Sequence, residues 1–421
     1  MSSISNHAAL APFRVRSFRF QWPADLLTSW AFEMETLILG WYVLVQTGSV
    51  LMLTVFGALQ YVGTLIAPLL GVIGDRIGQR NLMSGMRAVY ATLAAIVMTL
   101  AFADMLSPGL VLVLAAVTGI VRPSDMGMRA ALVAESMPAP HLAAAAGISR
   151  TTSDSARIAG ALAGAGLFAA LGIGPAYTVV ACFYLLGLLF TLGVANVRPQ
   201  YSAPDAVAIS PPRLSAWRDL REGIHYVWTT PHLQAAMWIA FLVNMTAFPL
   251  TSGLLPYVAR GVYGTDQTGL GYLAASFAFG GLLGSISVSV MSSKIHLGRI
   301  VTIFGLLWYA LLLVFSQTQN EQQVIIVLML AGFMQSLNMV PLTVILLRTS
   351  HERFRGRVMG VRMLAIYSLP FGLLAAGALI ERIGFAGTAA VYSVFGLLCT
   401  LLIAIRWRAH LWRLDAPANA R

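Results

Sequence analysis

Long runs of apolar residues, separated by very short polar segments, recur along almost the whole chain. A transmembrane helix needs about 20 mostly apolar residues to cross the hydrocarbon core of a bilayer. Twelve such runs lie at Pro23–Val45, Val50–Leu70, Leu82–Phe102, Leu110–Ala131, Ala143–Leu171, Tyr177–Val197, Leu233–Tyr257, Gly269–Met291, Ile300–Phe315, Val324–Leu347, Met359–Ile380 and Ala389–Trp407. The pattern predicts an all-α integral membrane protein with twelve transmembrane helices.

Composition and the placement of charge support this prediction. Of the 421 residues, 58% are hydrophobic and only 10% are charged, whereas an average soluble domain carries roughly 25% charged residues. The net charge is +11, but only Arg260 and Arg382 of the 27 basic residues fall in one of the two sets of loops. By the positive-inside rule we expect both termini in the cytoplasm and the protein in the inner (cytoplasmic) membrane. The basic charge therefore indicates topology, and no nucleic-acid partner is expected.

A polar stretch, 198–231, separates two sets of six predicted helices. We expect an N-terminal half at 1–197 and a C-terminal half with a cytoplasmic tail at 232–421. Within the stretch, apolar residues recur at helical spacing: Leu214, Trp217, Leu220, Ile224 and Val227. This spacing is typical of an amphipathic helix at the cytoplasmic membrane surface. An ordinary linker helix on the surface accounts for it equally well.

The two predicted halves resemble each other weakly. Small residues are dense at Gly160–Gly166 in the fifth span and at Gly372–Gly377 in the eleventh. Such residues allow helices to approach closely in lipid. Duplicated halves around a central site are typical of carriers that work by alternating access.

The most specific motif is Gly71-Val-Ile-Gly-Asp-Arg-Ile-Gly-Gln-Arg80, in the loop after the second span. It resembles the G-x-x-x-D-R-x-G-R-R signature of the major facilitator superfamily. In that family, the aspartate that matches Asp75 caps a helix of the opposite half and latches one conformation, as a carboxylate at a helix N-terminus can. Gln79 replaces the usual basic residue, which implies a weaker latch. The resemblance assigns the latch to Gly71, Gly74, Asp75, Arg76, Gly78 and Arg80, with Glu135 as the partner of Arg76.

Other segments are similar to one subgroup of that family, which contains enterobactin exporters and macrolide efflux proteins. They are Gly40-Trp41-Tyr42, Thr47-Gly48-Ser49, Arg122-Pro123 with Arg129, and Arg355-Gly-Arg-Val-Met-Gly360. The resemblance implies a proton-driven exporter of a siderophore or a drug-like molecule, without a cofactor and with the proton gradient as its energy source. We expect a monomer.

Charged residues inside the predicted spans mark a second set of candidates, because each costs roughly 2.5–3.5 kcal/mol at the bilayer centre. Arg122, Asp125 and Arg129 share one face of the fourth span, and Arg150, Asp154 and Arg157 repeat that spacing on the fifth. Since the two spans are antiparallel, we expect Asp125 to meet Arg150 or Arg157, and Asp154 to meet Arg122. The cluster is either a structural clasp or a site that attracts an anionic substrate or exchanges protons.

Glu33 and Glu35 lie in the middle of the first span and point to opposite sides of the helix. Asp25, Ser29, Glu33 and Thr36 form one polar stripe that is predicted to line a central cavity. Desolvation favours the neutral form of a buried carboxyl group, which suits a proton carrier. The candidates for proton coupling are therefore Glu33, Glu35, Asp125 and Asp154. A carboxyl group that only orients a neighbouring helix is the alternative.

Substrate contacts are predicted from the remaining polar and aromatic residues of the spans. Together with the charged side chains above, the predicted cavity residues are Asp25, Trp30, Glu33, Arg122, Arg129, Arg157, Trp238, Asn244, Gln335, Asn338 and Tyr367. Aromatic rings offer faces for a planar ligand. Asn and Gln at membrane depth more commonly form hydrogen bonds between helices.

Several classes of protein are disfavoured. A P-loop requires a Gly-rich turn before a lysine and a following Ser or Thr, but the only lysine is Lys294, between Ser293 and Ile295. We therefore expect no ATP binding. No H-E-x-x-H or G-x-S-x-G element supports a membrane enzyme, and the duplicated halves favour a carrier over a channel. The sequence predicts a secondary active exporter of a small organic molecule, with an importer of a nutrient or metabolite as the alternative.

Overall fold

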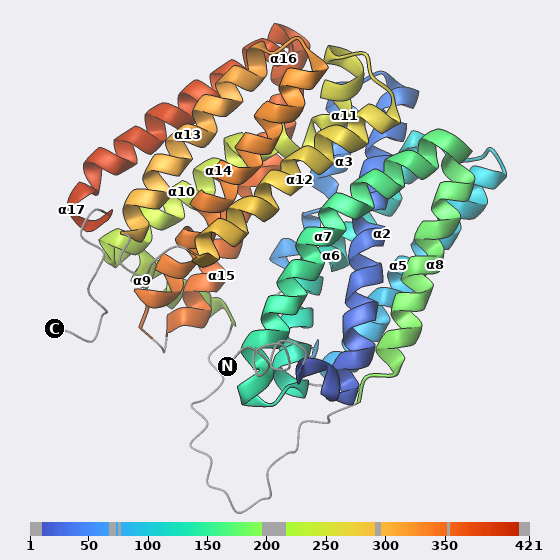
Figure 1. Ribbon diagram of the computed structural model, residues 1–421, viewed down its shortest axis with the longest axis horizontal. Helices are drawn as coiled ribbons and strands as arrows, with labels where there is room; N and C mark the ends of the chain where they lie inside the picture. The colour runs from blue at the N-terminus through green and yellow to red at the C-terminus, as the bar shows by residue number, and fades with distance from the viewer. Residues whose placement is uncertain are drawn as a thin grey trace, which may run out of the picture. The chain divides into compact units, whose positions relative to one another are not determined.

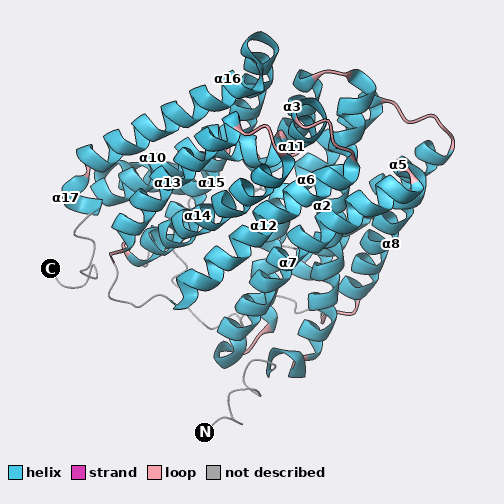
Figure 2. Cartoon of the chain, turned by 45° about the horizontal axis from the view of Figure 1, so that its top comes forward, coloured by secondary structure: helices cyan, strands magenta, loops and turns pink. Residues whose placement is uncertain are grey.

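The computed structural model describes residues 11–66, 73–74, 77–195, 216–290, 296–351 and 354–411. All regular secondary structure in these ranges is helical (Figure 2). The helices of the N-terminal part are η1 (Ala11–Arg14), α2 (Arg16–Thr47), α3 (Val50–Leu59), η2 (Val62–Leu65), α5 (Gln79–Phe102), α6 (Pro108–Ser136), α7 (Ala139–Leu171) and α8 (Ile173–Leu192). They are followed by α9 (Ala216–Thr229), α10 (Pro231–Phe248), η3 (Pro249–Gly253), α11 (Leu255–Tyr257), η4 (Val258–Val262), α12 (Gln267–Val290), α13 (Leu297–Gln317), α14 (Glu321–Arg348), α15 (Arg355–Ile366), α16 (Ser368–Arg406) and α17 (Arg408–Leu411).

The chain forms two compact units. The first comprises Met1–Gly48, Leu59–Val207 and Asp266–Gly271, and the second comprises Ser49–Ala58, Ala208–Thr265 and Tyr272–Arg421. Inside the first unit, α2 packs along α7 and α8, and α5 packs along α8 (Figure 1). Inside the second, α13 packs against α14 and α16, and α10 against α16. The predicted division of the sequence at 197 and 232 stays a prediction.

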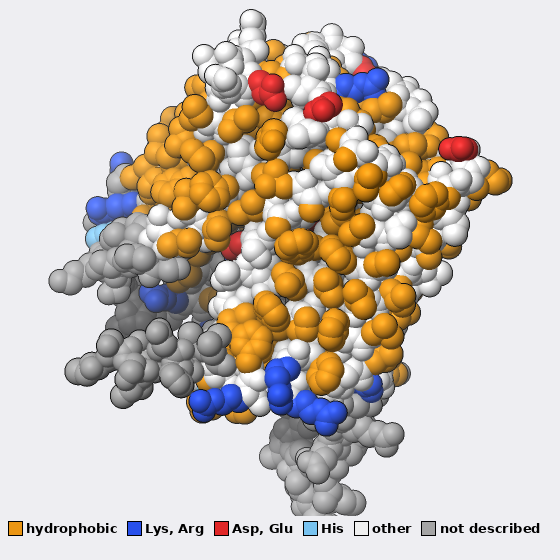
Figure 3. Space-filling view, turned by 45° about the vertical axis from the view of Figure 1, so that its right-hand side comes forward, with side chains coloured by type: hydrophobic (Ala, Val, Ile, Leu, Met, Phe, Trp, Pro, Cys, Tyr) orange, Lys and Arg blue, Asp and Glu red, His pale blue; other side chains and the backbone are white. Residues whose placement is uncertain are grey.

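Among the described residues, eight helical segments are long and apolar enough to cross a membrane. Six are single helices (α5, α6, α8, α12, α13 and α14), one is α10 with η3, and one is the continuous stretch of α15 and α16. With that stretch counted as two spans, and with α2, α3 and α7 added, the helices fit the predicted twelve-helix layout. Hydrophobic side chains are spread over the face seen in Figure 3, and several Arg side chains gather at its lower edge.

Proline and glycine explain where the helices depart from the predicted spans. The predicted eleventh span is divided at Tyr367, because the ring of Pro370 conflicts with a continuous helix at the carbonyl of Ile366, four residues earlier. Gly384 has φ 71° and ψ 174° and turns the chain between the eleventh and twelfth spans. In the seventh span, the helix widens to a π-helix at Pro249, whose carbonyl accepts from the backbone N–H of Leu254 at 3.1 Å.

Small residues let helices approach closely in both units, as the sequence predicts. A Cβ atom on Gly164 of α7 would lie 2.9 Å from the Cα of Met34 in α2. In the second unit, a Cβ atom on Gly372 of α16 would overlap the carbonyl oxygen of Met245 in α10. These two glycines therefore fix the distance between the helix pairs.

The helix predicted in the linker is present as α9, and it packs on α15. Glu222 Oε2 lies 2.8 Å from Arg357 Nη1, and the ring of Tyr226 stacks on Phe354 with centroids 4.4 Å apart. Val227 is buried, whereas Ile224 on the predicted apolar face is exposed. The amphipathic segment is therefore anchored to the second unit through polar and aromatic side chains.

Candidate functional site

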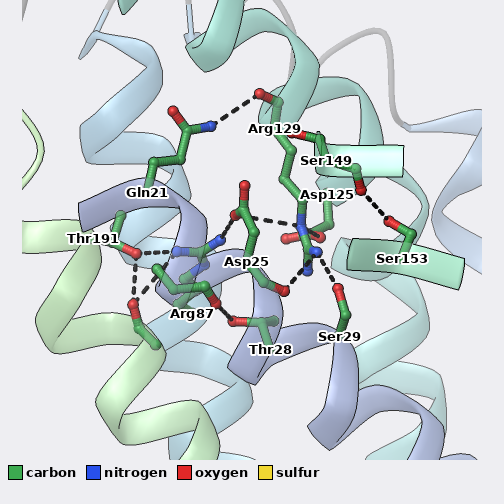
Figure 4. A network of polar contacts seen from close by, with 12 residues as sticks. Gln21, Asp25, Thr28, Ser29, Arg87, Asp125, Arg129, Ser149, Ser153 and Thr191 are labelled. Carbon is green, nitrogen blue, oxygen red and sulfur yellow. Dashed lines mark hydrogen bonds and ion pairs between the residues drawn. The ribbon is translucent and has the colours of Figure 1, made fainter. Parts of the chain in front are cut away.

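Two buried charges of the first unit form an ion pair between α2 and α5 (Figure 4). Arg87 Nη2 contacts Asp25 Oδ1, and the Arg87 side chain is 1% exposed. Arg87 Nη1 also donates to Thr191 Oγ1 and, at 3.4 Å, to the carbonyl oxygen of Gly187, both on α8. A guanidinium group at membrane depth requires such partners, so Arg87 joins three helices through one side chain.

Arg129 of α6 links this pair to a second carboxylate. Its Nε contacts Asp125 Oδ2 and lies 3.8 Å from Asp25 Oδ1. Its Nη1 donates to Ser29 Oγ at 2.5 Å and to the carbonyl oxygen of Asp25 at 3.2 Å (Figure 4). We call Asp25, Arg87, Asp125 and Arg129 the tetrad. With both carboxylates ionised the tetrad is electrically neutral, so it satisfies its own charges inside the helix bundle.

Glu35 lies ten residues after Asp25 on α2 and is buried. Tyr184 donates to Glu35 Oε2 at 2.6 Å, and Tyr177 donates to Oε1 at 3.2 Å. Both tyrosines belong to α8 and are almost completely buried. Each carboxyl oxygen therefore accepts a hydrogen bond from one buried tyrosine hydroxyl.

Arg122 of α6 lies near Glu35 but has different partners. Its Nη1 donates to Thr36 Oγ1 at 3.0 Å and to Gln60 Oε1. Its guanidinium carbon lies 4.7 Å from the centroid of the Phe32 ring, a cation–π contact. Among the described residues, no carboxylate forms an ion pair with Arg122, and its side chain is half-buried.

The ion pairs predicted between the fourth and fifth spans are wrong. Asp125 pairs with Arg129, and Asp154 pairs with Arg150 at 3.2 Å, so each carboxylate uses an arginine four residues away on its own helix. The physical reason is that an i, i+4 pair faces the same side of a helix and needs no second element to form. The two spans therefore do not clasp each other through these charges.

The fifth span does contact the first. Trp22 Nε1 donates to Thr152 Oγ1 at 2.9 Å, and Gly160 packs against Trp30 and Glu33. Arg157 is half-buried, with no hydrogen bond or ion pair among the described residues. Glu33 is likewise half-buried. Three other residues of the predicted polar stripe have polar partners outside α2: Asp25, Ser29 and Thr36. Glu33 has no hydrogen bond or ion pair among the described residues.

In the second unit, the predicted polar residues are used mainly for packing. Asn338 is fully buried, and its Nδ2 donates to the carbonyl oxygen of Val301 at 2.6 Å, which joins α14 to α13. Asn244 donates to the carbonyl of Ala240 on its own helix, and Gln335 is buried on α14. Trp238 is exposed and lies edge-on to Phe241, while Tyr367 is the residue between α15 and α16.

The predicted latch is described only in part. Gly71, Asp75 and Arg76 lie outside the described residues, and so does any pair between Arg76 and Glu135. The backbone N–H of Gly78, at φ 90°, donates to the carbonyl of Gly74 at 2.9 Å. Arg80 Nη2 donates to the carbonyl of Leu192 at the end of α8, at 2.5 Å. The latch stays a prediction.

Sequence reasoning missed Arg87, Gln60, Tyr177 and Tyr184. Arg87 left a signal, because it is a single arginine in the middle of the apolar run at Leu82–Phe102. Gln60 interrupts the second span in the same way. The tyrosines left no distinctive signal, since aromatic residues are common throughout the spans.

Comparison with known proteins identifies this multi-pass bundle, with charges held inside one of its units, as an integral membrane transporter and not an enzyme. The model of the Major Facilitator Superfamily matches residues 24–370 and 237–419. The chain belongs to that family.

One relative is the Multidrug efflux pump Tap of Mycolicibacterium fortuitum, which is 25% identical over 367 residues, 83% of this chain and 85% of that protein. The solved nucleoside transporter NupG matches with a TM-score of 0.74 and 10% identity over 92% of this chain and 99% of that chain. A POT family transporter in complex with 5-aminolevulinic acid matches with a TM-score of 0.72 and 15% identity, over 94% and 96%. The likeness to these two structures is one of fold alone.

Proposed function

We propose that this protein is a proton-coupled exporter of a small organic molecule that works by alternating access. The observation that carries the proposal is the environment of Glu35, a carboxyl group that is buried between α2 and α8 and bound by two tyrosine hydroxyls. A buried carboxyl group of this kind exchanges a proton when its surroundings change between two conformations. Glu33, two residues away and half-buried, is the second candidate.

Export as the direction rests on the relative named as a multidrug efflux pump. The sequence motifs of the first span, the fourth span and the loop between the tenth and eleventh spans support the finer proposal of the enterobactin-exporter and macrolide-efflux subgroup, with a siderophore or drug-like substrate. We further propose that the protein is a monomer in the inner membrane with both termini in the cytoplasm. The bias of Arg and Lys toward one set of loops supports this orientation.

The test begins with a drug-sensitive bacterial host that expresses the protein, in which a panel of antibiotics and siderophores identifies compounds whose toxicity or retention falls. Each positive compound is then measured in proteoliposomes with an imposed pH gradient. We expect uptake into liposomes that are acidic inside, which corresponds to export from a cell. Transport only with the gradient reversed would make the protein an importer and overturn the proposed direction.

Variants of the two glutamates test the coupling. Glu35→Gln and Glu33→Gln together are expected to abolish pH-driven transport while the thermal unfolding transition is retained. Glu321→Gln is the matched control, because Glu321 is exposed in the first turn of α14. Unchanged pH-driven transport in the double variant would remove both glutamates from the mechanism.

A further inference from the structure

Five arginines of the first unit, at positions inside the predicted spans, fall into two groups according to their partners. Arg87, Arg129 and Arg150 each contact a carboxylate: Asp25, Asp125 and Asp154, respectively. Arg122 and Arg157 contact none among the described residues. Since a cation inside a membrane protein is costly without a counter-charge, these two arginines require an explanation that the tetrad does not supply.

Some N–H donors of Arg122 are not used by hydrogen bonds to the described residues. A guanidinium group carries five N–H donors, and the two hydrogen bonds of Arg122 to protein both start from Nη1 and end on neutral oxygens, those of Thr36 and Gln60. Phe32 covers one face of the group at 4.7 Å. The side chain is thus held in a fixed position, while Nε and Nη2 are without a hydrogen bond in the part of the chain that the structure describes.

Arg157 belongs to the same neighbourhood. It lies one turn before Gly160, one of the residues at which α7 touches α2: a Cβ atom on Gly160 would lie 2.9 Å from the Cβ of Glu33. Arg122 contacts the same part of α2, through the hydroxyl of Thr36 and the ring of Phe32. Two arginines from two helices therefore lie beside the same segment of α2, and neither is fully buried.

The nearby carboxylates do not occupy these donors. Glu33 forms no ion pair or hydrogen bond within the described residues. Glu35 interacts electrostatically with Arg122, but its two oxygens accept from Tyr177 and Tyr184. The tetrad also holds N–H donors without a hydrogen bond, on Arg87 and Arg129, but each of these arginines is paired with a carboxylate. Arg122 and Arg157 differ in having no ion pair among the described residues.

We infer that Arg122 and Arg157 form a subsite for an anionic group of the transported molecule: a carboxylate, sulfonate or phosphonate. Arginine N–H groups are arranged to bind the oxygens of such groups in pairs. The aromatic face of Phe32 beside Arg122 favours an anion that is attached to a planar or apolar body. This inference rests on the proposed function, in that it names the substrate class of the same carrier.

The experiment compares binding of 2-naphthoate and 2-naphthamide to the purified, full-length protein in detergent. The two probes have the same ring system and differ in charge. Hydrogen bonds to charged groups contribute about 1.5–3 kcal/mol, so we expect naphthoate to bind roughly 10-fold to 100-fold more tightly than the amide. Arg122→Gln and Arg157→Gln are each expected to reduce that ratio, and the double variant to abolish it.

Arg150→Gln is the matched control, because Arg150 is on the same helix as Arg157 but is exposed and already paired with Asp154. It should keep the wild-type ratio. Equal affinity of the wild type for the two probes, including no measurable binding of either at millimolar concentration, would overturn the inference. So would a ratio that survives in the double variant. The assay uses no gradient, so it fails or succeeds independently of proton coupling and of transport direction.

Discussion

The two units differ in what they bury. Among the described residues, every buried charged side chain lies in the first unit: Asp25, Glu35, Arg87, Asp125 and Asp154. The buried polar side chains of the second unit are amides and hydroxyls, such as Asn338, Gln335 and Thr246. Amides and hydroxyls join helices at modest cost, whereas buried charges are expensive and are typical of functional sites in membranes. We therefore expect charge-dependent chemistry in the first unit, and polar side chains of the second unit to act mainly in its own packing.

The largest effect should follow from breaking the tetrad. Asp25→Asn leaves Arg87 buried without its carboxylate, and removal of one partner from a buried ion pair costs roughly 3–5 kcal/mol. We expect that loss in the free energy of unfolding, measured by equilibrium denaturation in mixed micelles. The double variant Asp25→Asn with Arg87→Gln should lose less than the sum of the two single variants, because neither charge is then left alone. A single variant as stable as the wild type would contradict the role of the tetrad.

A smaller loss is expected at Glu35. Tyr184→Phe removes the 2.6 Å hydrogen bond to Glu35 Oε2 without changing the shape of the side chain. A hydrogen bond to a charged group contributes about 1.5–3 kcal/mol, and one to a neutral group about 1 kcal/mol. The free energy of unfolding of this variant, measured at neutral pH, therefore reports whether Glu35 is ionised in the folded protein. Tyr177→Phe, which removes the longer bond of 3.2 Å, is expected to cost less. The reverse order would contradict the geometry.

The sequence predicted the helical fold better than the partners of the buried charges. Apolar runs of the length of a membrane span were enough for the all-helical fold, and Pro370 and Gly384 explain why the last predicted spans are divided as they are. Charged residues in the spans identified most of the site. The partners of those charges were not predictable, because spacing along a helix shows which residues share a face but not which neighbouring helix faces them. Asp125 and Asp154 were therefore assigned to the wrong arginines, and Arg87 was overlooked.

The second unit supplies the contrasting test. Asn338→Leu removes the hydrogen bond from Nδ2 to the carbonyl of Val301, but it also removes Oδ1, which is buried without a hydrogen-bond partner in the structure. The two changes oppose each other, so we expect a net loss of about 1 kcal/mol or less in the free energy of unfolding. Proton-driven transport by this variant should stay near that of the wild type. A loss as large as that of Asp25→Asn would show that the second unit depends on polar contacts as strongly as the first.

The smallest effect on the free energy of unfolding is expected at Arg150. This variant tests whether a charge of the first unit must be buried to matter for stability. Arg150 pairs with Asp154 at 3.2 Å, but 63% of the Arg150 side chain is exposed. Exposed i, i+4 pairs contribute about 0.3–0.5 kcal/mol, because solvent screens the charges and the long side chain loses freedom when it pairs. Arg150→Ala should therefore change the free energy of unfolding by less than about 0.5 kcal/mol, and the change should shrink further at high salt, which screens exposed charges. If Arg150→Ala cost as much as Asp25→Asn, the stability of the first unit would depend on its charges in general. A negligible cost would restrict that dependence to the charges that its helices enclose.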